Sequence, residues 1–396
     1  MAGPIDFDVA IVGGGLAGLS LSIQLAKPGH RVVLFEKEQY PFHKVCGEYI
    51  SMESWNFLVS LGLNLEKINP PIISMLQVSA VNGKISGHKL PLGGFGISRY
   101  KLDHCLAQLA REAGVTILEN TKVNQVSFNG SSFLLETSRQ PYTAKLACGS
   151  FGKRSNIDIR WQRQFIIAAK NKLNNYVGIK YHIKTNFPPD TIALHNFDDG
   201  YCGIVKIEDD KYCLCYLTTA ANLQRCNGSV KEMEQAILCQ NPYLQTIFSN
   251  SEFLYEEPLA ISQISFDKKE QVENHVLMIG DSAGMITPLC GNGMSMALHA
   301  SKLAASRIDL FLKHRISRAE MERQYRLQWK KYFSHRLKTG RRVQRLFGRR
   351  WITNYFVALA GRRIDNLLRA VEHRLGGPVA LGILVAGQEL LDRLLF

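Results

Sequence analysis

The stretch Phe7–Gly18, FDVAIVGGGLAG, decides the fold class of this 396-residue chain. A short apolar run ends in closely spaced glycines, and an apolar helical pattern follows until Pro28-Gly29. A second apolar run, Val32–Phe35, ends at Glu36. Strand, glycine turn, helix, strand and acid in this order are typical of a βαβ unit that binds a dinucleotide.

Each glycine of this turn has its own physical task. Gly13 permits the tight turn, Gly15 lets the backbone approach a pyrophosphate, and Gly18 lets the helix pack close to the strand. The N-terminus of the helix adds partial positive charge for the diphosphate. Glu36 can accept hydrogen bonds from ribose hydroxyls, and an acid at this position disfavours a 2′-phosphate. The alternative is a glycine turn that binds nothing.

A second strand–loop–helix unit follows near residue 280. The apolar run Val276–Ile279 leads into Gly280-Asp281, and Pro288 and Gly291-Asn292-Gly293 precede a helix expected from about Met294 to Leu312. Taken alone, Gly280-Asp281 is equally well explained as an ordinary turn with a helix N-cap. Together with the N-terminal unit, it favours a second contact with the same dinucleotide.

With these two units, the segment Lys44-Val45-Cys46-Gly47-Glu48, and Arg99 before a Leu102-Asp103 helix, the sequence resembles the flavoprotein monooxygenase superfamily. It is most similar to the geranylgeranyl reductase branch, over residues 5 to about 312. The resemblance implies an α/β (α+β) fold: a glutathione-reductase-like FAD-binding Rossmann domain, an inserted antiparallel β-sheet substrate domain and a helical C-terminal tail.

The expected domain boundaries follow from this resemblance and from the local patterns. Residues 1–74, 97–158 and 271–312 form the FAD-binding domain, 75–96 and 159–270 the substrate domain, and 313–396 a basic helical region. Alternation over Tyr176–Ile183 and Tyr212–Leu217 predicts strands, with Cys213 and Cys215 on one strand face in a packing role rather than a metal site. A helix over Val230–Leu238 interrupts the strands.

The resemblance also implies roles for single residues. Asp281 would bond the ribityl chain of FAD, Arg99 would face the phosphates, and Gly291–Gly293 would lie against the isoalloxazine. The following helix would point its positive end at the flavin N1/C2=O edge. The predicted FAD-binding residues are Gly13, Gly15, Ala17, Gly18, Glu36, Lys37, Lys44, Cys46, Gly47, Arg99, Val123, Gly149, Gly280, Asp281, Pro288, Gly291, Asn292, Gly293 and Met294.

The sequence departs from the superfamily pattern in several places. Related hydroxylases carry a central Asp-Gly pair that touches FAD and NAD(P)H, and here Cys148-Gly149 stands in its place, which argues against direct use of a nicotinamide. Tyr201 is kept from an aromatic substrate motif whose Trp and Phe-Pro are missing. The WxWxIP run of flavin-dependent halogenases is absent, as are the second GxGxxG and the CxxxxC pair of disulfide reductases.

The sequence therefore predicts an FAD-dependent oxidoreductase that acts on a hydrophobic small molecule. The reaction is either hydride transfer through flavin N5, as in an alkene reductase, or monooxygenation through a flavin hydroperoxide, with NAD(P)H as a candidate electron donor. Cys46 and Tyr201 are the predicted catalytic residues; their alternatives are a small turn residue and core packing. A flavin-binding, membrane-surface protein without turnover is the competing hypothesis.

Charge and cysteine usage bear on surroundings and partners. Residues 301–396 hold 21 Lys and Arg against 7 Asp and Glu, so the whole net charge of +14 belongs to the C-terminal region. Its alternating basic and apolar residues (from Arg336 and Leu337 to Arg350 and Phe356) indicate a peripheral membrane helix or a solvated helix packed on the FAD domain; no motif supports nucleic-acid binding. Nine scattered cysteines without zinc spacing, and no secretory leader, predict a cytoplasmic protein without a metal.

Overall fold

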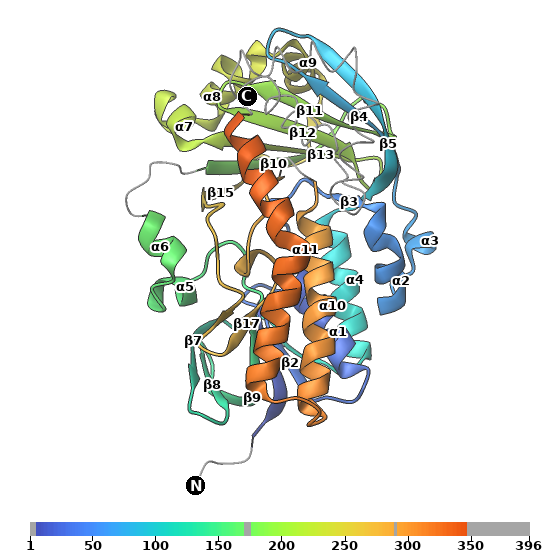
Figure 1. The fold of residues 1–396 in the computed structure, drawn as a ribbon. Coiled ribbons are helices and arrows are strands. Elements are labelled where there is room, and N and C mark those ends of the chain that lie inside the picture. The colour runs from blue at the N-terminus through green and yellow to red at the C-terminus, as the bar shows by residue number, and fades with distance from the viewer. Residues whose placement is uncertain (1–4, 170–175, 289–290, 347–396) are drawn as a thin grey trace.

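The computed structural model describes residues 5–169, 176–288 and 291–346. Two sheets organise this part of the chain, one in the lower half of Figure 1 and one in the upper half. The predicted α/β fold class is confirmed: the lower sheet is mainly parallel with helices packed beside it, and the upper sheet is mainly antiparallel.

The first sheet has the order β16-β17-β9-β1-β2-β6, with β7 and β8 attached to β9. Strands β17, β9, β1, β2 and β6 run parallel. The strand bounds are β1 Phe7–Val12, β2 Val32–Phe35, β6 Thr116–Leu118, β7 Val123–Phe128, β8 Phe133–Thr137, β9 Tyr142–Gly149, β16 Val272–Glu273 and β17 Val276–Met278. Strands β1 and β17 both pair in parallel with β9, so the two predicted glycine turns lie at the same end of the sheet, the carboxyl ends of the strands.

Four long helices pack beside this sheet (Figure 1). They are α1 Leu16–Ala26, α4 Arg99–Glu112, α10 Gly293–Leu312 and α11 Arg318–Leu346. Helix α1 contacts both α4 and α10, and is buried over nearly its whole length. Helix α11 packs on α10, and its Tyr325, Trp329 and Phe333 are buried, so the described part of the basic C-terminal region packs its apolar side inward. The predicted residues from Phe347 to Phe356 lie outside the described residues.

The second sheet has the order β14-β10-β13-β12-β11-β4-β5-β3, with β15 on β10. All neighbours are antiparallel except β11 and β4. The bounds are β3 Tyr49–Ser51, β4 Ile72–Ser79, β5 Ile85–Gly96, β10 Tyr176–Lys184, β11 Thr191–Phe197, β12 Gly200–Lys206, β13 Tyr212–Thr219, β14 Glu252–Phe253 and β15 Leu259–Ile264. The sheet therefore begins before the predicted boundary at residue 75, because β3 and the start of β4 pair with β5.

The two faces of the second sheet have different neighbours. One face packs against α7 Ala220–Arg225, α8 Val230–Ala236, the 3-10 turn η2 Leu238–Gln240 and α9 Pro242–Asn250. The other face forms an apolar cluster that includes Tyr49 of β3 and Met285, which follows the second glycine turn. The remaining short elements are η1 Met52–Ser54, α2 Trp55–Leu61, α3 Leu65–Ile68, α5 Asn156–Arg160, α6 Gln164–Ala169 and η3 Gly280–Ser282.

Candidate functional site

The two glycine turns meet in space, although more than 260 residues of chain separate them. Met278 of β17 and Val12 of β1 both pair with Gly149 of β9. A Cβ atom added to Gly280 would lie 3.0 Å from the Cβ of Ala17, at the start of α1. The carboxyl ends of β1, β9 and β17 thus bring together Gly13, Ala17, Gly149 and Gly280, as a ligand shared by both turns requires.

The first turn is built around three glycines with different surroundings. Gly13 has a φ of 104°, in the left-handed region that favours glycine. A Cβ at Gly18 would overlap the carbonyl oxygen of Gly13, so the residue is needed for helix packing. At Gly15 the nearest atom to an added Cβ is Arg99 Nη2, at 3.7 Å, so this residue borders open space. No side chain caps α1 at Gly15, which leaves backbone N–H groups for an anion.

Glu36 is held at the end of β2, beside this turn. Its Oε2 accepts a hydrogen bond from the Gly14 N–H at 2.9 Å, and its Oε1 accepts from the N–H groups of Lys37 at 2.8 Å and Glu38 at 3.1 Å. The Lys37 side chain itself is largely exposed. Val123, at the start of β7, follows Thr121, whose N–H donates to the Glu36 carbonyl oxygen at 2.9 Å. These residues define the end of the site predicted to hold the ribose.

Two cations stand at the first turn. Lys44 Nζ donates to the Gly14 carbonyl oxygen at 3.3 Å and to Asp103 Oδ2 at 3.0 Å. Arg99 donates to both Asp103 oxygens at 2.8 Å. Burial would raise the pKa of Asp103, but the charges of Arg99 and Lys44 lower it. Lys44 Nζ also lies 4.0 Å from Glu36 Oε2, so the two cations face two carboxylates. Both cations stand beside Gly14 and Gly15, where they could donate hydrogen bonds to a diphosphate.

Two further cations support the second turn. Buried Lys269 donates from Nζ to the backbone oxygens of Lys153 at 2.7 Å and Asp281 at 2.9 Å. Burial lowers the pKa of Lys269 to about 8, although the negative charges of Asp158 and Asp281 oppose this shift. Arg163 donates to the Ser282 carbonyl oxygen at 3.1 Å. Neither Lys269 nor Arg163 belongs to a recognised sequence motif. A small cavity beside them is lined by Gly280, Asp281, Gly284, Gly293, Ala297 and Trp329.

The start of α10 completes the site. Asn292 caps this helix without a side-chain hydrogen bond, and its buried Oδ1 has no partner among the described residues. A buried amide oxygen without a donor is costly, so a bound ligand that donates would fit. The next turn residues, Pro288 and Gly291, are joined by a 2.9 Å backbone hydrogen bond from Gly291 to Pro288. The residues of both turns therefore fit FAD.

Cys46 and Gly47 lie where the first turn, α10 and the second sheet come together. Cys46 Sγ is 3.7 Å from Met294 Sδ, and the Cys46 carbonyl oxygen accepts from the Cys213 thiol at 3.3 Å. Tyr201 is not part of this group. It lies on β12, four residues from Val205, which pairs with Cys213, a separation of roughly 13 Å along the strand. The structure thus separates the two predicted catalytic residues.

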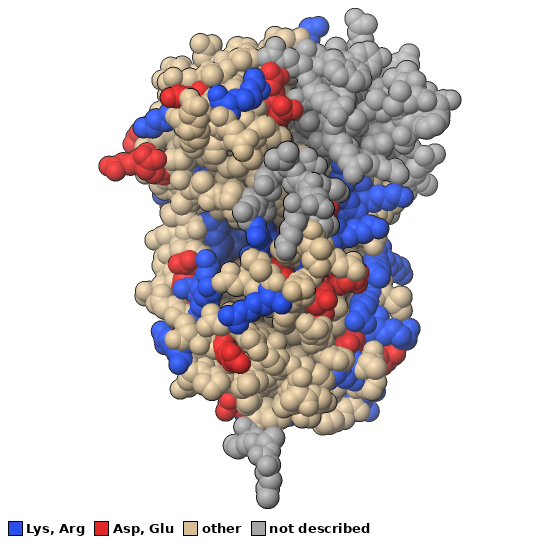
Figure 2. All heavy atoms as spheres, turned by 90° about the vertical axis from the view of Figure 1, so that its left-hand side faces the viewer, with Lys and Arg blue, Asp and Glu red and all other residues tan. Residues whose placement is uncertain are grey.

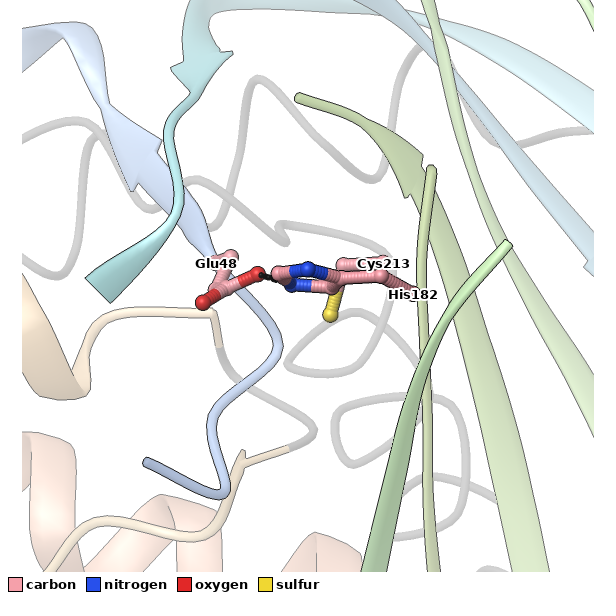
Figure 3. A group of neighbouring side chains, drawn as sticks. All are labelled: Glu48, His182 and Cys213. Atoms are coloured by element: carbon pink, nitrogen blue, oxygen red, sulfur yellow. Dashed lines mark hydrogen bonds and ion pairs between the residues drawn. The ribbon is translucent and has the colours of Figure 1, made fainter. Parts of the chain in front are cut away.

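A buried ionic cluster lies directly after Cys46. Figure 3 shows Glu48, His182 and Cys213 pointing toward one another. Glu48 Oε1 accepts from Lys180 Nζ at 2.5 Å and from the Arg99 N–H at 2.7 Å, and Glu48 Oε2 lies 2.6 Å from His182 Nε2. Burial would raise the pKa of Glu48, but the Lys180 charge and the His182 hydrogen bond lower it to about 2.

The cluster has three groups that could ligate a metal, yet its charges favour a different role. Ligand atoms of Glu48, His182 and Cys213 lie within 4.8 Å of one another. The Lys180 ammonium group already holds the position of a cation beside Glu48. Burial also raises the pKa of the Cys213 thiol well above its usual range, so the thiol keeps its proton. The cluster is therefore best described as a Glu48–Lys180 ion pair whose carboxylate also forms a hydrogen bond with His182.

Glu48 belongs to a segment that carries the family resemblance, whereas its partners Lys180 and His182 belong to no recognised motif. Lys180 and His182 lie two residues apart in the alternating run Tyr176–Ile183, so both point to one face of β10. Two ionisable residues on the buried face of an otherwise apolar strand are unusual, and this is the sequence feature that could have indicated a functional cluster. Asp103 is also an ionisable residue at a buried position, because it follows Leu102 on the buried side of α4.

Comparisons with known proteins agree with this geometry. A family model described as "FAD binding domain" matches residues 8–44. Among curated relatives, "Conditioned medium factor receptor 1" of Dictyostelium discoideum is 24% identical and aligns with 83% of this chain and 68% of its own length. The "Kynurenine 3-monooxygenase" of Flavobacterium psychrophilum is 23% identical (82% and 74%). The "Digeranylgeranylglycerophospholipid reductase" of Methanococcus vannielii is 24% identical (82% and 82%).

Two solved structures share the fold. A geranylgeranyl bacteriochlorophyll reductase-like protein from Thermoplasma acidophilum superposes with a TM-score of 0.77 at 17% identity, over 98% of each chain. The flavin-dependent halogenase CmlS superposes with a TM-score of 0.75 at 20% identity, over 89% of this chain and 65% of its own. The FAD-domain match, with relatives named as a reductase and a monooxygenase, confirms the predicted class: the protein is an FAD-dependent oxidoreductase. Its relatives include the geranylgeranyl reductase type that the sequence resembles.

Proposed function

We propose that the protein uses bound FAD to reduce a carbon–carbon double bond of a hydrophobic small molecule. The observation that carries this proposal is the apolar face of the second sheet that packs against the residues following the second glycine turn. The buried apolar side chains of this face include Leu76, Val78, Ile192, Leu194, Val205 and Leu217, together with the predicted Tyr201. The same cluster contains Met285, three residues after η3. A wall of this kind suits a prenyl or acyl chain rather than a charged substrate.

Residues of the chain would hold both reactants. Lys44, Arg99 and the α1 N-terminus would bind the diphosphate of FAD, and Asn292 would accept a hydrogen bond from the cofactor. When bound, FAD would supply the hydride. Tyr49, whose buried hydroxyl has no partner among the described residues, would bind a polar group of the substrate. Cys46 and Met294 would pack beside the reacting atoms.

Anaerobic reduction tests this proposal. The purified holoprotein is reduced with NADPH, NADH or dithionite and then mixed with a polyprenyl lipid or a prenylated quinone. Reoxidation of the flavin with one double bond reduced per flavin supports the proposal, and the reductant that works identifies the electron donor. If the substrate is oxygenated, with consumption of oxygen, once air is admitted to the reduced protein, the result would instead mark a monooxygenase. A flavin spectrum that no reductant and no lipid changes would favour the non-catalytic alternative.

The basic C-terminal region would bring the enzyme to lipophilic substrate. Helix α11 buries Tyr325 and Phe333 while Lys330, Lys331 and Lys338 are exposed. Figure 2 shows Lys and Arg side chains gathered along the right-hand edge of the face it draws. No described helix is long and apolar enough to cross a bilayer. Surface contact through basic residues is the remaining mode that this charge supports.

Vesicle sedimentation tests this contact. The full chain should sediment with vesicles that contain phosphatidylserine, and remain in the supernatant with neutral phosphatidylcholine vesicles. Binding should weaken as the salt concentration rises, because the attraction is screened. Equal sedimentation with both vesicles, or with neither, would contradict the proposed electrostatic contact.

A further inference from the structure

A chain of hydrogen bonds connects the half-buried His43 with the buried Glu48. The Tyr255 hydroxyl lies 3.1 Å from His43 Nδ1 and 2.8 Å from His182 Nδ1. The other nitrogen of His182 lies 2.6 Å from Glu48 Oε2. Each link is within ordinary hydrogen-bond distance, so the four side chains form one continuous path.

Three separate segments of the chain build this path. His43 directly precedes Lys44 in the loop after β2, Tyr255 lies between β14 and β15, and His182 lies on β10. The Tyr100 ring stacks on His43 at 4.6 Å, and the rings of His43 and Tyr255 are 5.1 Å apart. Since packing from several elements holds the rings in place, the path belongs to the folded structure rather than to a single loop.

The groups have the chemistry that proton transfer needs. An ionised carboxylate only accepts, so His182 Nε2 donates to Glu48. His182 Nδ1 can then accept from the Tyr255 hydroxyl, whose oxygen can accept from a His43 N–H. Burial and the Lys180 charge lower the pKa of His43 to about 4, so its ring is neutral near pH 7 and can both donate and accept.

At the buried end of the path, the negative charge of Glu48 is compensated by the positive charge of Lys180. The titratable or charged groups that face the path are Glu48, Lys180, Cys213, Glu208 and Lys211, besides His43, Tyr255 and His182 themselves. Glu48 and Lys180 neutralise each other. A proton that arrives at His182 therefore meets a neutral ion pair, with the Glu48 carboxylate in contact with it.

We propose that His43, Tyr255 and His182 form a proton path from solvent to the Glu48–Lys180 pair beside Cys46. Its use in catalysis rests on the proposed function. Reduction of a double bond adds a hydride, supplied by reduced FAD, to one carbon and a proton to the other. The proton enters from water at His43, which protonates the Tyr255 oxygen as the Tyr255 hydroxyl proton passes to His182 Nδ1. His182 then holds the proton at the buried pair, from which the second carbon takes it.

Hydrogen exchange at His182 tests the path without any substrate. The gain and loss of a proton at His182 Nδ1, the nitrogen that the path reaches, can be followed by NMR in protein with labelled histidine, and its exchange with solvent can be timed. Tyr255→Phe keeps the ring and removes the hydroxyl, so exchange should slow by about an order of magnitude or more. Tyr100→Phe is the matched control, because its ring stacks on His43 outside the hydrogen-bonded chain; it should exchange like the wild type.

The outcomes separate a path from mere packing. Loosened structure in Tyr255→Phe would speed exchange, so unchanged or faster exchange overturns the proposal. Slower exchange in His43→Ala that added imidazole restores would support it, and slow exchange that imidazole leaves unchanged would contradict entry at His43.

Turnover distinguishes this proposal from the proposed function. With FAD bound and reducible, Tyr255→Phe should slow double-bond reduction by about a hundredfold. If the wild type reduces no double bond but Tyr255→Phe still slows exchange, the path stands and the proposed function fails. If the wild type is active and the variant matches it in both measurements, the path fails alone.

Discussion

Glu48 shows how the cluster beside Cys46 depends on single residues. It has a left-handed backbone with a φ of 56° and a side chain with no exposed area. Such a carboxylate is tolerated only because Lys180, His182 and the Arg99 N–H all bind it. Removing one partner of a buried ion pair leaves the other charge without compensation.

A double-mutant cycle tests this dependence. Glu48→Gln should lower the free energy of unfolding by about 3–5 kcal/mol, because it strands the Lys180 ammonium group. Adding Lys180→Met to the same chain should recover much of that loss, since the stranded charge is gone. Urea unfolding of the wild type, both single variants and the double variant measures the coupling. Effects that simply add would show that the two side chains do not interact as described.

His195 predicts a pH dependence of stability. It is buried on β11, with Nδ1 at 2.8 Å from Ser79 Oγ, and burial lowers its pKa from 6.5 to about 4. Between these values the unfolded chain binds more protons than the folded one, so the free energy of unfolding falls as the pH falls. At pH 5 this loss from His195 is about 2 kcal/mol.

Urea unfolding at pH 7 and pH 5 measures this loss. His195→Gln should remove about 2 kcal/mol of the difference between the two pH values. The exposed His314 offers a control, and His314→Gln should keep the full difference. Equal pH dependence in His195→Gln and the wild type would contradict the role assigned to burial.

At the scale of elements, the first glycine turn separates folding from ligand binding. Gly18 is required by packing, because an added Cβ would overlap the Gly13 carbonyl oxygen. Gly15 has only Arg99 Nη2 near it, at 3.7 Å, and an extended φ and ψ that alanine adopts readily. A larger side chain at Gly18 is therefore excluded by contacts within the protein, whereas a larger side chain at Gly15 would be excluded by the bound ligand.

Alanine at each glycine makes this distinction measurable. Gly18→Ala should lower the free energy of unfolding by about 1–3 kcal/mol, from overpacking. Gly15→Ala should change the stability of the FAD-free protein by less than about 0.5 kcal/mol, as surface changes do. It should nevertheless weaken FAD binding, because the methyl group would stand where the pyrophosphate approaches. Chemical denaturation and FAD titration of both variants provide the readouts, and a fully stable Gly15→Ala that binds FAD normally would refute this placement.

Elements were predictable from sequence where local signals were strong. The βαβ unit, the second strand–turn–helix unit and the helix up to Leu312 follow from apolar runs and glycines. Helix α9 was missed in a region interpreted as strands, although Asn241 accepts from the Tyr243 N–H and Pro242 occupies the first turn. Helix α4 begins at Arg99, three residues before Leu102, because Ser98 caps it.

The site was predictable only in part, for a physical reason. Glycines and apolar runs act locally, so the two turns could be placed on one ligand before the structure was known. The Glu48 cluster depends on contacts across more than 130 residues, from β10 to the segment after Cys46. Tyr255 and His43 are likewise brought together by tertiary packing alone. No sequence spacing encodes such pairs.

At the scale of the whole molecule, α11 ties the C-terminal region to the second turn. Buried Tyr325 donates its hydroxyl proton to the Met278 carbonyl oxygen at 2.6 Å, at the end of β17. Trp329 lines the cavity that contains Asp281, and an added Cβ at Gly284 would lie 2.8 Å from its ring. Helix α11 thus packs against the end of the first sheet where FAD is expected to bind.

Truncation of Trp329 tests this support. Trp329→Ala should lower the free energy of unfolding by about 3–5 kcal/mol, as expected for a buried aromatic side chain. It should also weaken FAD binding, because the wall behind Asp281 is lost. Thermal unfolding with and without FAD measures both effects. A variant with the stability and FAD affinity of the wild type would show that α11 is independent of the site.

The most direct test of the account is the flavin stoichiometry of the purified chain and of two variants, one at each turn. The wild type should be yellow and bind one FAD per chain. Gly15→Ala and Asp281→Ala should each reduce the affinity for that same molecule, because both turns contact it. A folded wild-type protein that stays colourless and takes up no FAD would contradict the central claim, and so would two variants that both bind FAD as the wild type does.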